Sequence, residues 1–301
     1  MADITHQRLG ELLRGVFAVL ASHPGGLSAA EAITTTAERV APTAHEQALL
    51  PNGKRRYDTM LRWATVDCVV AGWLVKAHGR WSITPAGEAA YAETSDPAAF
   101  HKRANQIYKS RKSTAATGPV PAPKADDVEP AADAAGKSAA VTFEQADEQA
   151  WSEIERHLET MDPYDFQDLV AALLKAMGYH IAWIAPKGKD GGVDIVAFND
   201  PLGTRPPRIK VQVKRQQQKV DVNGLRSFLA VLAADDAGIF VNTGGFTADA
   251  TDAARKDHLH RATLVDMERL VDLWTEHYAR LDETARRRLP LQPIYFLAPE
   301  S

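Results

Sequence analysis

The stretch from residue 113 to residue 140 places the strongest limit on how this chain can fold. It is rich in Ala, Pro, Ser and Asp, contains no aromatic residue, and has few large apolar side chains. Such a segment cannot bury enough apolar surface to offset the conformational entropy that ordering would cost. In a chain of 301 residues it predicts two folded domains joined by a flexible linker. We expect the first domain at 1–95, the linker at 96–144 and the second domain at 145–301.

The composition says little about function but excludes some classes of protein. Hydrophobic residues make up 45% of the chain and charged residues 25%, as in ordinary globular proteins. The single cysteine, Cys68, cannot form an internal disulfide and suits a reducing cytoplasm. No apolar run approaches the ~18 residues of a membrane helix, so we expect a cytoplasmic protein without membrane contact. The net charge of −4 at pH 7 does not indicate a nucleic-acid binder, so any DNA-facing charge must be local.

The first domain has the pattern of a mainly helical winged helix. Apolar residues recur at helical spacing over 5–21, Ser28 and Glu31 form a capping box, and a third helix is predicted over 54–70. The segment WLVKAHGRWSIT then alternates and turns at His78-Gly79, as a hairpin does. Three helices followed by a two-stranded wing is the element order of a winged helix, in which the helix before the wing usually enters the major groove.

That third helix carries the candidate DNA contacts of the first domain. Arginine is the usual reader of phosphates and guanine edges, and the predicted contacts are Arg55, Arg56, Thr59 and Arg62. The alternative is a solvated polar face on a winged helix that binds protein.

Strand alternation in the second domain brings three polar side chains toward one patch. In the strand RIKVQVKR, Gln212 and Lys214 point to one face, and Val211 and Val213 point to the other. Asp194 lies in the preceding strand, VDIVAF, and leaves the face that its apolar neighbours bury. If the two strands pair as a hairpin, a carboxylate, an amide oxygen and an ammonium converge. Mg²⁺ takes oxygen ligands, so we predict a metal site of Asp194, Gln212 and the main-chain carbonyl of Val213, with Lys214 beside the phosphate.

By itself this pattern is weak, because a polar strand face is common. The segments YDFQDLVAALLKAMGY, GKDGGVDIVAF, DPLGTRPPRIKVQVKR and GIFVNTGGFTADATDAA occur in this order. Together they resemble the catalytic domain of Mrr-like restriction endonucleases, of the PD-(D/E)xK superfamily, over roughly residues 150 to 275. The fragment AGWLVKAHGRWSITPAGEAAYAE is similar to the end of the N-terminal domain of such proteins.

The resemblance implies a fold, a set of roles and a cofactor. The fold is an α/β domain with an αβββαβ core, in which helices flank a mixed sheet. The catalytic residues are Asp194 as metal ligand, Gln212 at the position that is Asp or Glu in most of the superfamily, and Lys214 as catalytic lysine. The cofactor is Mg²⁺, for which Mn²⁺ can substitute. The chain departs from the family at Gln167, where members often carry Glu, so that Gln167 and Asp190 remain only as accessory candidates.

The expected activity is therefore endonucleolytic cleavage of double-stranded DNA by a homodimer, in restriction of foreign or methylated DNA. One alternative is a non-catalytic DNA-binding regulator with a decayed nuclease domain, which the missing Glu favours slightly. Another is a nuclease for branched or damaged DNA, which would use the same active site.

Overall fold

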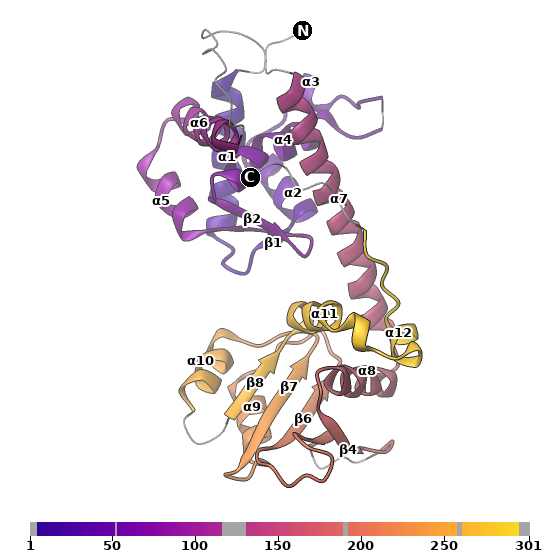
Figure 1. Ribbon diagram of the computed structural model, residues 1–301. Helices are drawn as coiled ribbons and strands as arrows, with labels where there is room; N and C mark the ends of the chain where they lie inside the picture. Colours follow the sequence, from indigo (N-terminus) through magenta and orange to yellow (C-terminus); the bar gives the residue numbers. More distant parts are fainter. Residues whose placement is uncertain (1–4, 52, 116–130, 189–191, 258–260, 295–301) are drawn as a thin grey trace. The chain divides into compact units, whose positions relative to one another are not determined.

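The computed structural model describes residues 5–51, 53–115, 131–188, 192–257 and 261–294. These form two units, one that ends at Ser152 and one over Glu153–Ile294 (Figure 1). Each unit has its own sheet and its own core.

Unit 1 is mainly helical, and most of its helices begin at capping residues. Thr5 caps α1, Ser28 and Glu31 form the predicted capping box of α2, and Thr84 caps α5. The helices are α1 (His6–Ala21), α2 (Ala29–Arg39), α3 (Ala44–Gln47), α4 (Arg56–Val70), α5 (Pro85–Glu93), α6 (Pro97–Ala115) and the first part of α7 (Ala131–Thr160).

The sheet of unit 1 follows the third long helix, as the sequence predicts. Strands β2 (Leu74–Ala77) and β3 (Arg80–Ile83) pair antiparallel, and β1 (Leu27–Ser28) adds to the other edge of β3. The hairpin turns at His78 and Gly79, whose φ angles are 51° and 68°, a conformation that glycine adopts without strain.

The predicted linker at 96–144 needs correction at both ends. Residues 97–115 are α6, whose Phe100 and Ala104 are fully buried. The Phe100 ring packs edge-on against Phe17 of α1 at 5.0 Å between centroids, and it also contacts Trp73. Residues from 131 onward belong to α7, which the composition of the surrounding stretch concealed. The part of the expected linker at 116–130 lies outside the described residues.

Unit 2 has the element order helix, three strands, helix, strand, as expected. The elements are α8 (Pro163–Ala176), β4 (His180–Ile184), β5 (Ile195–Phe198), β6 (Arg208–Lys214), α9 (Val222–Leu229), β7 (Asp236–Asn242), α10 (Ala248–Lys256), β8 (Arg261–Val265), α11 (Met267–Glu276), η1 (Tyr278–Arg280) and α12 (Glu283–Arg288). The short helix α12, which Asp282 caps, was not predicted.

The five strands form one mixed sheet in the order β4-β5-β6-β7-β8. The pairs β4–β5 and β5–β6 are antiparallel, whereas β6–β7 and β7–β8 are parallel. Helices surround this sheet in Figure 1. Phe228 of α9 packs on Phe240 of β7. Gln212 is the partner of Phe240 in the β6–β7 pairing, so α9 covers the same face of the sheet as the one that carries Gln212 and Lys214. The mixed sheet flanked by helices confirms the predicted fold class.

Among the described residues, no helix combines the length and apolar character needed to cross a membrane.

Candidate active site

Asp194 directly precedes β5 and is held by main-chain hydrogen bonds on both sides. Its main-chain N–H donates to the carbonyl of Val211 at 2.8 Å, and its own carbonyl accepts from the N–H of Ala185 at 2.8 Å. The residue is 6% exposed. A buried carboxylate needs partners, and the N–H of Val213 supplies one at 2.6 Å from Oδ2.

The pairing of β5 with β6 brings the predicted residues together. Ile195 lies opposite Val211, so the register places Asp194 opposite Gln212. Residues that face each other across antiparallel strands share one side of the sheet. Lys214 lies two residues further along β6 and therefore points to the same side. The hairpin that the sequence analysis assumed is thus present, and it gathers Asp194, Gln212 and Lys214 on one face.

The two neighbouring lysines of β6 have different surroundings. The Lys210 ammonium lies 2.8 Å from the carboxylate of Asp236 and donates to the carbonyl of Val231 at 2.7 Å. The Lys214 ammonium lies 5.5 Å from the centre of the Phe240 ring. No ion pair of Lys214 occurs within the described residues. Lys210 therefore serves the fold, whereas Lys214 can serve a phosphate.

The oxygen donors at this part of β5 and β6 are of the kind that a magnesium ion takes. They are the Asp194 carboxylate, the side-chain carbonyl of Gln212 and, at the same place on β6, the main-chain carbonyl of Val213. Gly192 lies beside Gln212, because a Cβ added at Gly192 would be 3.9 Å from Nε2 of Gln212. Within the described ranges no three His, Cys, Asp or Glu side chains cluster as a metal site would require. Mg²⁺ is commonly held by one or two carboxylates together with waters and substrate phosphates, so this donor set suits an ion that binds with its substrate.

Gln167 has a structural contact that the sequence did not reveal. Its Nε2 donates to the carbonyl of Ala185 at 2.9 Å, and the N–H of Ala185 in turn bonds to Asp194. The Gln167 side chain therefore positions the segment that carries Asp194. The other accessory candidate, Asp190, lies outside the described residues.

The segment that carries these residues is similar to a known protein family. Residues 158–274 match the family Mrr_cat, described as a restriction endonuclease. The matched segment contains all three residues of the candidate active site. Residues 158–274 are thus similar to a restriction endonuclease domain.

A solved structure of the MspJI restriction endonuclease in complex with a 27-mer oligonucleotide matches at 17% identity with a TM-score of 0.32. The match covers 55% of this chain and 39% of the MspJI chain. Comparison with curated proteins gives no match.

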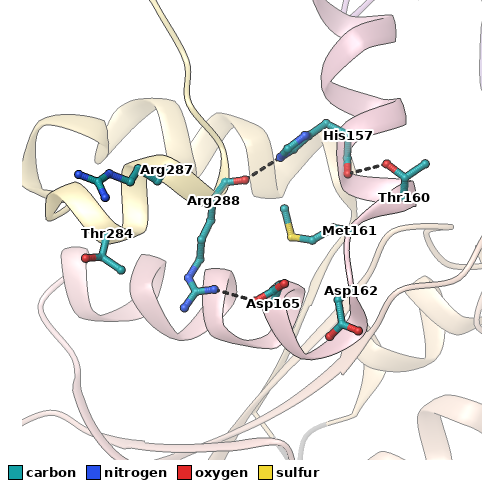
Figure 2. A pocket seen from close by; sticks show the side chains of 8 residues that line it. All are labelled: His157, Thr160, Met161, Asp162, Asp165, Thr284, Arg287 and Arg288. Atoms are coloured by element: carbon teal, nitrogen blue, oxygen red, sulfur yellow. Dashed lines mark hydrogen bonds and ion pairs between the residues drawn. The ribbon is translucent and has the colours of Figure 1, made fainter.

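A pocket in unit 2 is lined by residues other than those of the candidate active site. It is lined by the end of α7, the start of α8 and α12, and includes His157, Asp162, Asp165 and Arg288 (Figure 2). Arg288 pairs there with Asp165 at 3.1 Å and with Asp168 at 2.9 Å, and its carbonyl contacts Nε2 of His157 at 2.6 Å. These contacts join three helices, and the pocket contains none of the predicted catalytic residues.

Three of the four predicted DNA contacts lie at or near the start of α4 and are partly exposed. Arg55 pairs with Asp58 at 2.6 Å, and Arg56 contacts the ring of His45. The hydroxyl of Thr59 points back to the carbonyl of Arg55 at 3.5 Å. These side chains remain accessible to a ligand at this end of the helix.

Arg62 departs from the prediction, because it is 8% exposed and lies beneath α7. It donates to Glu144 at 2.5 Å, and to both carboxylate oxygens of Glu148 at 2.6 and 2.9 Å. Lys76 of β2 meets the other oxygen of Glu144 at 2.5 Å. Burial lowers the pKa of Lys76 to about 8, although Glu144 opposes that change. A buried charge requires such partners, and no local pattern in the sequence places these acids near α4.

A signal for this contact was present on α4 itself. Val66 lies one turn after Arg62 on the same face of α4, and it is 7% exposed. A face in contact with solvent alone would not need a buried valine at this position. It packs against Tyr108 and Val141. A helix with apolar residues on two faces is covered on both.

Proposed function

We propose that this chain is a metal-dependent endonuclease that hydrolyses phosphodiester bonds of double-stranded DNA and restricts foreign or methylated DNA. The observation that carries the proposal is the pairing of β5 with β6. It brings the Asp194 carboxylate to the main-chain N–H of Val213, the residue between Gln212 and Lys214. The family match over 158–274 supports the nuclease class. Restriction of methylated DNA rests on the family resemblance alone.

The chain's own groups have distinct tasks in this reaction. In hydrolysis a water oxygen bonds to phosphorus, the bond from phosphorus to the leaving sugar oxygen breaks, and that oxygen takes up a proton. The Lys214 ammonium stabilises the negative charge that grows on the phosphoryl oxygens, or orients the attacking water. Asp194 and Gln212 hold the cation, for which Mg²⁺ or Mn²⁺ is the candidate. When bound, this ion polarises a phosphate oxygen and lowers the pKa of a bound water.

Unit 1 is proposed to bind the DNA as a winged helix. The helices α1, α2 and α4 precede the β2–β3 hairpin, and the basic start of α4 holds Arg55 and Arg56. Cleavage of both strands requires two active sites, acting together or in turn, and a homodimer would supply them.

A DNA-binding protein without cleavage is the second candidate. Among the described residues the site has one carboxylate, and the Gln167 amide bonds to a main-chain carbonyl. Fewer anionic ligands weaken metal binding, which favours this alternative.

Plasmid cleavage separates the two candidates. Methylated and unmethylated supercoiled plasmids are incubated with Mg²⁺, Mn²⁺ or EDTA, using wild type and Asp194→Ala. Metal-dependent nicking that Asp194→Ala abolishes supports the nuclease, and the methylation contrast defines its target. Equal DNA binding by both proteins without any cleavage would favour the binding protein. Preference for junction over linear duplex would indicate a repair nuclease instead.

A further inference from the structure

The first half of α7 lies along α4 and the β2–β3 hairpin. Near the start of α4, the Lys54 ammonium contacts the side chain of Gln145 at 2.5 Å. In the middle of the helix, Val141 packs against Val66. At the hairpin turn, the rings of Trp151 and His78 lie 4.9 Å apart. The helix thus covers a continuous face from the beginning of α4 to the tip of the hairpin.

Three acidic residues of α7 point at this face. Glu144, Asp147 and Glu148 have the i, i+3, i+4 spacing that places side chains on one side of a helix. Glu144 accepts from Arg62, Lys76 and, at 3.1 Å, from the indole N–H of Trp81. Glu148 accepts hydrogen bonds from both terminal nitrogens of the Arg62 guanidinium.

Asp147 completes the set at the hairpin, where it accepts from the main-chain N–H of Gly79 at 3.2 Å. Guanidinium, ammonium and main-chain N–H groups are the donors that proteins direct at DNA phosphates. A winged helix presents its recognition helix and its hairpin to DNA. The carboxylates of α7 therefore occupy the positions at which phosphates would be expected.

We infer that α7 is a built-in cover on the DNA-binding face of unit 1, and that DNA competes with Glu144, Asp147 and Glu148 for this face. The inference rests on the proposed role of unit 1 in DNA binding. With α7 in place, Arg62 and Lys76 are neutralised and buried. With α7 displaced, both cations become available to phosphates. The apparent affinity for DNA is then reduced in proportion to the fraction of molecules that are uncovered.

Two variants that change charge in opposite directions test the cover. Glu144→Gln combined with Glu148→Gln removes the acids, whereas Val141→Asp breaks the apolar contact and adds a negative charge. Binding of a short labelled duplex to the full chain is measured in EDTA over a range of salt concentrations. Both variants are expected to bind at least about tenfold more tightly than wild type. For the Val141→Asp variant, the negative slope of log affinity against log salt concentration should also become steeper by about two, because Arg62 and Lys76 each add a phosphate contact.

The matched control is Glu38→Gln combined with Glu88→Gln, which makes the same charge change at exposed sites on α2 and α5. It should change the affinity less than about twofold, because exposed charges far from the contact are screened. Hydrogen exchange verifies the perturbation: residues 137–152 must lose amide protection while α1 and α6 keep theirs.

Three results would overturn the inference. If only the Gln variant binds more tightly, the change in net charge explains the result and displacement of α7 does not. Unchanged affinity in both variants, with α7 exposed to exchange, would show that this face does not bind DNA. Retained protection of α7 in both would show that these contacts do not hold it. Metal-dependent plasmid cleavage by wild type, measured in parallel, would in each case leave the proposed nuclease activity standing.

Discussion

His101 gives unit 1 a specific sensitivity to acid. The residue lies on α6, is 5% exposed, and its Nδ1 is 2.7 Å from Nδ1 of His6. One ring must donate and the other accept in this contact, which suits a neutral His101. Burial is the main cause that lowers the pKa of His101 to about 4, and the nearby charges of His6, Lys137 and Lys109 add to it.

The sign and size of the effect follow from that pKa. The ordinary pKa of histidine is 6.5, so between pH 6.5 and about 4 the unfolded chain binds a proton that the folded chain does not. Stability is therefore complete above pH 6.5 and falls as the pH drops through this window. A pKa difference of about 2.5, at about 1.4 kcal/mol for each unit, gives a loss of at most about 3.5 kcal/mol.

The unfolding of unit 1 can be followed separately, because Cys68 is the only cysteine and is fully buried in this unit. We propose urea titrations from pH 7 to pH 4, read by labelling of Cys68 with a dithiopyridine reagent. Wild type should lose stability across the window, His101→Gln should lose much less, and His23→Gln, at an exposed position, should behave as wild type. Parallel losses in wild type and His101→Gln, or an imidazole signal of His101 that titrates near 6.5, would refute the packing of α6 in this core.

Two substitutions test other contacts of the fold. Gly10→Ala would place a Cβ 1.8 Å from the carbonyl oxygen of Pro97, so it should destabilise unit 1 by about 1–3 kcal/mol or more in the Cys68 assay. Gly25→Ala, which meets nothing within 4 Å, is its control and should change stability much less. Gln167→Leu leaves the Ala185 carbonyl without its donor and should cost unit 2 about 1–3 kcal/mol in urea unfolding. Equal stability of Gln167→Leu and wild type would mean that this hydrogen bond does not hold the Asp194 segment.

The parts of the fold that local rules determine were predictable. Ser28 with Glu31, and Thr84, marked the starts of two helices because caps act within one turn. Alternation in β6 separated Gln212 and Lys214 from the buried Val211, since neighbouring side chains of a strand point to opposite faces. Only the pairing of β5 with β6 had to be assumed, and the structure contains it.

Contacts between distant parts of the chain were not predictable from these rules. Arg62 and Glu148 are 86 positions apart, and nothing near either residue indicates the other. The α6 and α7 helices were missed because the linker composition dominates the stretch around them, although Phe100 and Ala104 form an apolar stripe one turn apart. The loss of Arg62 from the exposed DNA contacts has the same origin.

The role proposed for Lys214 of β6 offers the most direct test of the proposed nuclease activity. Single-turnover cleavage of a labelled duplex in Mg²⁺ is compared for wild type, Lys214→Met and Lys175→Met, the last an exposed control on α8. We expect Lys214→Met to lower the rate about 10²–10³-fold, the size typical of removing one group that stabilises transition-state charge. Lys175→Met should cleave as wild type. A Lys214→Met variant that cleaves at the wild-type rate would contradict the proposed active site.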